Sequence, residues 1–127
     1  MAFLAKERTN SLYTVTVKDD TGTLIPKANV TSLKLTLFNL EDDAQTIINS
    51  RNAQEQAPGF TGDVTMGATN GVVSFAMQPA DNQLIGLTPS QNQRYERHRL
   101  IFDITANSKR LVFQDEILVE NTEKITT

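Results

Sequence analysis

The chain has 127 residues, of which 39% are apolar, and its formal net charge is −3. This length fits one domain with a single core, and the negative charge argues against a nucleic-acid binder that works by neutralising phosphates. The lack of cysteine excludes disulfides, thiolate chemistry and cysteine-based zinc sites. The sequence begins without a signal-peptide pattern and contains no apolar run long enough for a membrane span, so we expect no membrane partner.

Five segments alternate apolar and polar residues, which predicts β-strands because successive strand side chains point to opposite faces. In chain order the apolar positions are Tyr13, Val15 and Val17; Leu33, Leu35 and Leu37; Val73, Phe75 and Met77; Leu100, Phe102 and Ile104; and Leu111, Phe113, Ile117 and Val119. Apart from Met77 and Val119, these are also the residues expected to form the core. Asp115 interrupts the inward set of the last strand.

The segments between these strands carry turn and loop signals. The four residues 106–109 form a short polar connector, so the last two strands should make a hairpin. A further short strand is expected at 46–48. Pro79 suits a first helical position and Gly86 a helix stop, which predicts a short corner helix between them.

The stretch 49–70 is rich in polar residues, has no usable periodicity and contains one isolated aromatic residue, Phe60. Long loops inside compact domains are usually functional or disordered. The sequence therefore predicts an all-β, antiparallel sandwich with one short corner helix. Its expected parts are an N-terminal arm at 1–10, a single domain at 11–121 that includes the 49–70 loop, and a C-terminal tail at 122–127.

One triplet has a catalytic precedent. Asp20-Thr21-Gly22 is the triplet that retroviral-type aspartic proteases place at a dimer axis, where two carboxylates share one proton. The preceding Lys18 and Asp19 stand where those proteases have apolar residues, and an exposed turn is the preferred interpretation. The protease remains a remote alternative, and we expect no enzyme activity.

His98 is the sole histidine, and it lies in the run from Arg94 to Arg99 that Glu96 interrupts. A metal site with two histidines is therefore excluded, and a catalytic base is less favoured than a histidine at a strand edge. The basic run favours salt-bridged strand or subunit contacts over nucleic-acid binding. We expect no cofactor and no metal.

With these elements in place, the chain resembles a group of small virion or prophage proteins encoded among the head and tail-connection genes of tailed bacteriophages. The matching segments are 6–8, 13–16, 36–37, 48–54, 70–72, 77–82 and 96–102, together with the closing strand through 119–121. The segment 55–69 matches least. The resemblance implies an immunoglobulin-like β-sandwich in the particle and no catalytic residues.

The expected function is therefore structural, at the head-to-tail neck or collar or as a capsid decoration protein, through contacts with capsid, portal or connector proteins. A homo-oligomer is expected, made in the bacterial host cytoplasm and located in the virion. The alternative is a tail fibre or spike adaptor that binds a host surface. The candidate partner contacts are Phe3, Leu4, Phe60, Arg97 and Arg99. The arm would add to a neighbour's sheet, and Phe60 would either anchor the loop in a partner or fold back on the core of its own domain.

Overall fold

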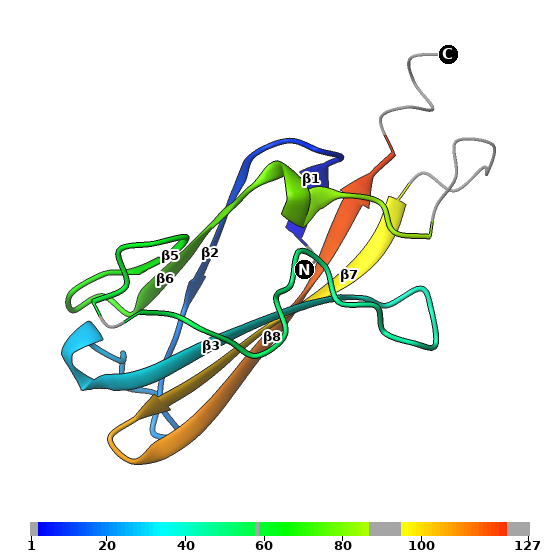
Figure 1. Cartoon of the computed structure of the whole chain (residues 1–127). Helices are drawn as coiled ribbons and strands as arrows, with labels where there is room; N and C mark the ends of the chain where they lie inside the picture. The colour runs from blue at the N-terminus through cyan, green and yellow to red at the C-terminus, as the bar shows by residue number, and fades with distance from the viewer. Residues whose placement is uncertain (1–2, 58, 87–94, 122–127) are drawn as a thin grey trace.

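A computed structural model describes residues 3–57, 59–86 and 95–121 of the chain (Figure 1). Its strands are β1 (Phe3–Lys6), β2 (Ser11–Thr16), β3 (Val30–Asn39), β4 (Gln54–Glu55), β5 (Val64–Met66), β6 (Val72–Met77), β7 (Tyr95–Ala106) and β8 (Lys109–Glu120). Two short 3-10 helices, η1 (Lys27–Asn29) and η2 (Pro79–Asn82), complete the regular structure. No helix in these described ranges is long and apolar enough to cross a membrane.

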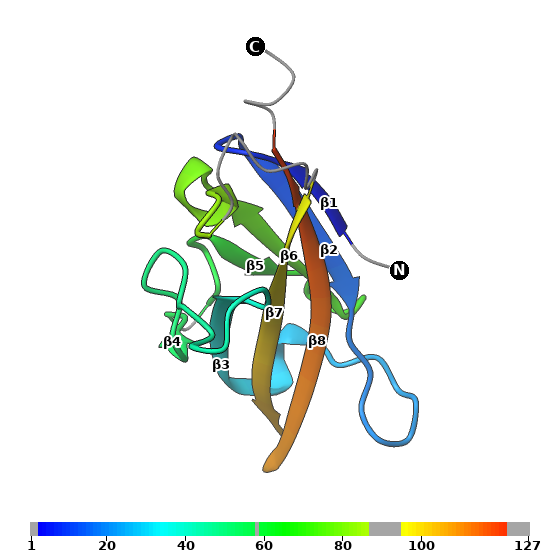
Figure 2. The same cartoon turned by 90° about the vertical axis from the view of Figure 1, so that its right-hand side faces the viewer.

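The strands form two sheets packed face to face (Figure 2). The larger sheet has the order β1-β8-β7-β3-β4 and the smaller has the order β2-β6-β5. In the larger sheet, β8, β7 and β3 correspond to strands G, F and C of an immunoglobulin domain. In the smaller sheet, β2, β6 and β5 correspond to strands B, E and D. The predicted all-β, immunoglobulin-like sandwich is confirmed.

The core lies between the sheets and contains most of the residues that alternation predicted. Leu33, Leu35, Leu37, Phe75 and Phe102 are among the fully buried side chains. Tyr13 of β2 stacks on Phe102 of β7, with ring centroids 6.1 Å apart; a disulfide joins the corresponding two strands in antibody domains. Three predicted core residues, Val15, Leu111 and Phe113, are only half-buried.

The predicted hairpin is present, whereas the predicted corner helix and the short strand at 46–48 differ from their predictions. Asn107 and Ser108 connect β7 to β8 and both have positive φ, at 52° and 63°, which is the type I′ turn that suits the twist of a hairpin. The predicted corner helix is shorter than its sequence signals, because η2 ends at Asn82. The strand expected at 46–48 is wrong: only Ile47 forms an isolated bridge, to Phe38.

The N-terminal arm differs from its prediction. Phe3–Lys6 is a strand of this domain and pairs in parallel with Ile117–Glu120 of β8. Phe3 packs edge-on against Tyr13 at 5.4 Å between ring centroids. These four residues pair with β8 within the chain, so they belong to the sheet of this domain and form its edge strand.

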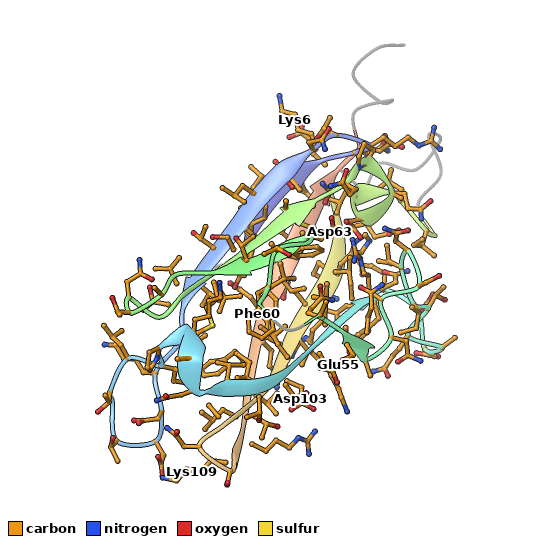
Figure 3. All side chains as sticks on the ribbon, turned by 60° about the vertical axis from the view of Figure 1, so that its left-hand side comes forward. Lys6, Glu55, Phe60, Asp63, Asp103 and Lys109 are labelled. Atoms are coloured by element: carbon orange, nitrogen blue, oxygen red, sulfur yellow. The ribbon has the colours of Figure 1, made fainter. Side chains whose placement is uncertain are left out.

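The 49–70 segment is also more ordered than expected. It contains β4 and β5, and Phe60 is 5% exposed in the core cluster. Figure 3 shows Phe60 between the two sheets. The segment has no strand periodicity because its strands are only two and three residues long and Phe60 has positive φ, at 49°.

Asp115, which interrupts the apolar set of β8, has a partner. Tyr13 Oη donates a hydrogen bond to Asp115 Oδ2 at 2.7 Å. Burial, this hydrogen bond and the carboxylate charge all raise the pKa of Tyr13. The contact links the edge strand of the small sheet to β8.

Replacing Tyr13 by phenylalanine should lower the free energy of unfolding by about 1.5 kcal/mol, because it removes a hydrogen bond to a charged group. Urea titrations of the wild type, Tyr13→Phe, Asp115→Ala and the double variant would give the coupling energy between the two side chains. Equal unfolding midpoints for the wild type and Tyr13→Phe would contradict the prediction.

Candidate interaction surface

Three of the five predicted contact residues lie on the outer face of the five-stranded sheet. Leu4 of β1 pairs with Leu118 of β8, and Leu118 pairs with Arg97 of β7. Paired residues on neighbouring strands present their side chains to the same face. Arg99 lies two residues further along β7 and so points the same way. Leu4, Leu118, Arg97 and Arg99 are called the outer patch below.

The outer patch combines an exposed apolar side chain with two guanidinium groups. Leu4 is 55% exposed. Arg97 contacts Glu41 at 3.4 Å between Nη2 and Oε1. Arg99 donates from Nη1 to Gln114 Oε1 at 2.7 Å, whereas its buried Nε has no hydrogen-bond partner among the described residues. The patch therefore combines apolar area with guanidinium groups that can face a carboxylate or carbonyl of a partner.

Phe3 and Phe60, the other two predicted contacts, point elsewhere. Phe3 is half-buried against the core, and Phe60 is part of it. Phe60 lines one side of a shallow pocket of about 350 Å³ that Lys27, Val30, Glu55 and other residues also border. With these aromatic rings inside the domain, the outer patch is the stronger candidate surface.

A buried arginine joins the long loop to the rest of the fold. Arg51 is 4% exposed and forms a bidentate pair with Asp81 of η2, with Nε–Oδ1 at 2.9 Å and Nη2–Oδ2 at 3.0 Å. Arg51 also donates to Gln54 at 2.7 Å and to Asp63 at 3.0 Å, and its guanidinium lies 5.2 Å from the centroid of the Phe75 ring.

Asp81 is fully buried and its carboxylate is saturated. It accepts hydrogen bonds from Asn49 Nδ2 at 2.9 Å and from the Gln78 backbone N–H at 2.8 Å, besides those from Arg51. Burial alone would lower the pKa of Arg51, but the hydrogen bonds that Arg51 donates to Asp81 and Asp63 raise it. The arrangement is a structural clamp between segments 48–54 and 77–82, which are among those that carry the phage resemblance.

Glu96 and His98 form a second buried pair, on the inner face of β7, so the expected surface or strand-edge position of His98 is wrong. Glu96 Oε1 and His98 Nε2 are 2.6 Å apart, and the two side chains are 1% and 0% exposed. The Glu96 carboxylate also accepts the backbone N–H groups of Ile85 and Gly86 at 2.8 and 2.9 Å. A carboxylate can orient an imidazole that acts as a base. Here the Glu96 carboxylate instead fixes the backbone of the segment after η2.

The triplet Asp20-Thr21-Gly22 is an exposed turn. Asp19, not Asp20, accepts the hydrogen bonds of the turn, from the backbone N–H groups of Thr21 and Thr23. Asp20 contacts Lys109 Nζ at 3.0 Å, and both side chains are more than half exposed. In retroviral-type proteases the two catalytic carboxylates share one proton in a dimer cleft shielded from water. Asp20 is exposed and paired with a lysine, which favours the interpretation as a surface turn.

Among the described ranges, no three histidine, cysteine or acidic side chains gather into a possible metal site. The expected absence of metals and cofactors stays a prediction. Sequence reasoning missed Leu118 and the buried pairs. Leu118 could have been found as the outward neighbour of Ile117 and Val119 in the alternation of β8.

No protein-family profile matches the chain, and no curated protein is similar to it. Among solved structures, the chain is similar to a chimeric titin Z1Z2 functionalized with a KLER exogenous peptide from decorin, at 12% sequence identity and a TM-score of 0.36. The similarity covers 94% of this chain and 43% of the titin chain, so this chain spans less than half the length of that one. At this score the similarity decides nothing, and the immunoglobulin-like assignment rests on the strand order of the two sheets.

Proposed function

We propose that the chain is a structural component of a tailed-bacteriophage particle, at the head-to-tail neck or collar or as a capsid decoration, and that it acts by protein–protein contact. Its partners are then capsid, portal or connector proteins, and its place is the virion, after synthesis in the bacterial cytoplasm. The resemblance of segments 48–54, 77–82 and 96–102 to phage head and tail-connection proteins supports this proposal.

The observation that carries the proposal is the outer patch. Leu4 and Arg97 flank Leu118 on the two neighbouring strands, and Arg99 lies on the same face of the sheet. Arginine is enriched in protein interfaces, and apolar side chains at their centre supply much of the binding energy. A partner surface with a small apolar hollow and carboxylate groups around it would fit the patch.

Incorporation into particles tests the proposal. In a lysate of the phage or prophage that carries the gene, the wild-type chain should sediment with assembled particles in a density gradient. Leu4→Asp should lower the amount bound per particle at least ten-fold, because the charge would have to be desolvated in the contact. A blot of gradient fractions measures this.

Leu12→Asp is the matched control. Leu12 is 60% exposed, as accessible as Leu4, but lies on the outer face of the smaller sheet. The control should be incorporated like the wild type, and both variants should unfold at the wild-type urea concentration. A wild-type chain that stays outside the particles overturns the proposed function. A Leu4→Asp chain that is incorporated normally overturns the role of the outer patch.

A further inference from the structure

The smaller sheet lacks a strand that immunoglobulin domains have. In a constant-type immunoglobulin domain this sheet contains strands A, B, E and D, with strand A next to strand B. Here the first strand, β1, pairs with β8 of the larger sheet instead, and the smaller sheet has only the order β2-β6-β5. Among the described residues, β2 therefore has no neighbouring strand on its outer side, and such an edge is a template for another strand.

The register between β2 and β6 shows which backbone groups are available at this edge. Val17 N–H donates to Gly71 C=O at 2.8 Å. In an antiparallel ladder the odd-numbered residues of β2 therefore direct their N–H and C=O groups toward β6. The even-numbered residues Leu12, Thr14 and Thr16 direct theirs outward. In the described part of the chain, the backbone groups of these three residues make no hydrogen bond.

The same side of the sandwich is incompletely closed. Tyr13 and Asp115 bring β2 and β8 together there, and the half-buried apolar residues Val15, Leu111 and Phe113 belong to these two strands. Figure 2 shows β8 continuing well beyond β1 toward the β7–β8 turn, so β1 covers only one end of this side. A strand added next to β2 would remove part of this apolar surface from water.

The composition of β2 favours an uncharged partner. Ser11–Thr16 contains no charged residue, proline or glycine, although exposed edges usually carry charges or proline that discourage pairing. The nearby Asp115 carboxylate is already occupied, because it accepts from Tyr13 Oη on one oxygen and from the Glu116 N–H on the other. A charged side chain placed next to Val15 would lose its water without gaining an opposite charge.

We propose that the position beside β2 takes one extended segment of another protein, antiparallel to β2, with uncharged apolar side chains at the alternate positions that face the core. The outward backbone groups of Leu12, Thr14 and Thr16 bind it, and it stands where strand A would be. A single segment fits better than the folded edge of a second copy. The larger sheet already reaches out over β2, since Phe3 of β1, its outermost strand, packs on Tyr13 at 5.4 Å, and a second copy would bring its own β1 into the same space.

The test supplies a strand within the purified chain, so it is independent of the proposed phage function. The probe is an N-terminal extension, Thr-Val-Thr-Val-Thr, joined to Met1 by a short glycine-serine linker. It should slow hydrogen exchange of the Leu12, Thr14 and Thr16 amides by about ten-fold or more and raise the urea midpoint of unfolding. The matched extension Thr-Lys-Lys-Lys-Thr should do neither, because either facing of that strand turns an ammonium group toward the core.

Two proline variants locate the added strand. Thr14→Pro removes an outward N–H of β2, so the domain should fold but the valine extension should no longer raise its unfolding midpoint. Val112→Pro, the matched control, removes an N–H that points away from β7 at the β8 edge and should keep the gain.

Three outcomes would overturn the proposal. Slow exchange of the Leu12, Thr14 and Thr16 amides in the unextended chain would mean that the chain itself fills the position. A wild-type dimer in sedimentation equilibrium that Thr14→Pro dissociates would make a second copy the occupant. A valine extension that leaves these amides exchanging as in the wild type would mean that no strand fits beside β2.

Discussion

Arg51→Met should lower the free energy of unfolding by about 3–5 kcal/mol, the usual cost of removing one partner of a buried ion pair. The substitution leaves the Asp81 carboxylate fully buried with neutral donors only. Domains of this size are stable by about 5–15 kcal/mol in total. Urea unfolding followed by circular dichroism would measure the loss.

The chain provides a matched control for burial. Arg110 and Asp103 form the same bidentate pair, at 2.9 and 3.0 Å, on the protein surface. Arg110→Met should leave the unfolding midpoint unchanged within error, because exposed ion pairs contribute little.

A second variant identifies the cause of the loss. Arg51→Met combined with Asp81→Asn should be more stable than Arg51→Met alone, since the uncompensated charge is gone. If Arg51→Met unfolds like the wild type, or if the double variant is less stable than Arg51→Met, the unpaired charge of Asp81 is not the cause of the lost stability.

Much of the fold follows from local pattern. The long strands β3, β7 and β8 bury one face, so their apolar residues alternate and are visible in the sequence. The hairpin between β7 and β8 follows from two adjacent residues that tolerate positive φ. Even Asp115 was recognisable as an exception, although its partner Tyr13 lies 102 positions away.

The parts that sequence reasoning missed depend on contacts between distant segments. β1 has four residues and pairs in parallel with the end of β8. It is too short to show a periodic pattern, and no turn signal in the sequence links it to β8. Arg51 and Asp81 look like polar loop residues until their pairing allows both to be buried. For Phe60 the sequence left a partner contact and burial in the domain core both open, and the path of the whole loop decides for the core.

The candidate surface was predictable in composition but not in arrangement. The sequence predicts Leu4 as an apolar residue of the N-terminal arm and Arg97 as a basic residue at the entry to a strand. Their pairing with the same residue, Leu118, depends on the registers of β1 and β7 against β8. Those registers are set by the turn and by core packing across both sheets, which no local segment contains.

Glu96→Gln should cost about 2 kcal/mol at neutral pH, because the buried carboxylate accepts hydrogen bonds from His98 and from the Ile85 and Gly86 backbone, and hydrogen bonds to charged groups contribute about 1.5–3 kcal/mol. When Glu96 is ionised it can only accept, so His98 donates from Nε2 at 2.6 Å. His98 Nδ1 has no hydrogen-bond partner in the part of the chain that the structure describes. The amide of glutamine would replace one acceptor with a donor.

The effect should depend on pH in a defined direction. Burial raises the pKa of Glu96, but the hydrogen bonds from His98, Ile85 and Gly86 outweigh it and hold the pKa below its ordinary value. A carboxyl whose pKa is lower in the folded state stabilises the fold above the unfolded pKa of about 4.3. That stability is lost as the pH falls toward the folded pKa.

The difference in unfolding free energy between the wild type and Glu96→Gln should therefore shrink as the pH falls below about pH 4. Urea titrations at several pH values measure it, and carboxylates common to both proteins cancel in the difference. Glu55→Gln makes the same chemical change at an exposed residue that accepts a hydrogen bond from Ser32 Oγ, and its difference in unfolding free energy should stay near zero. A Glu96→Gln difference that grows on acidification would mean that Glu96 is easier to protonate in the folded protein than in the unfolded chain, and the proposed brace would be wrong.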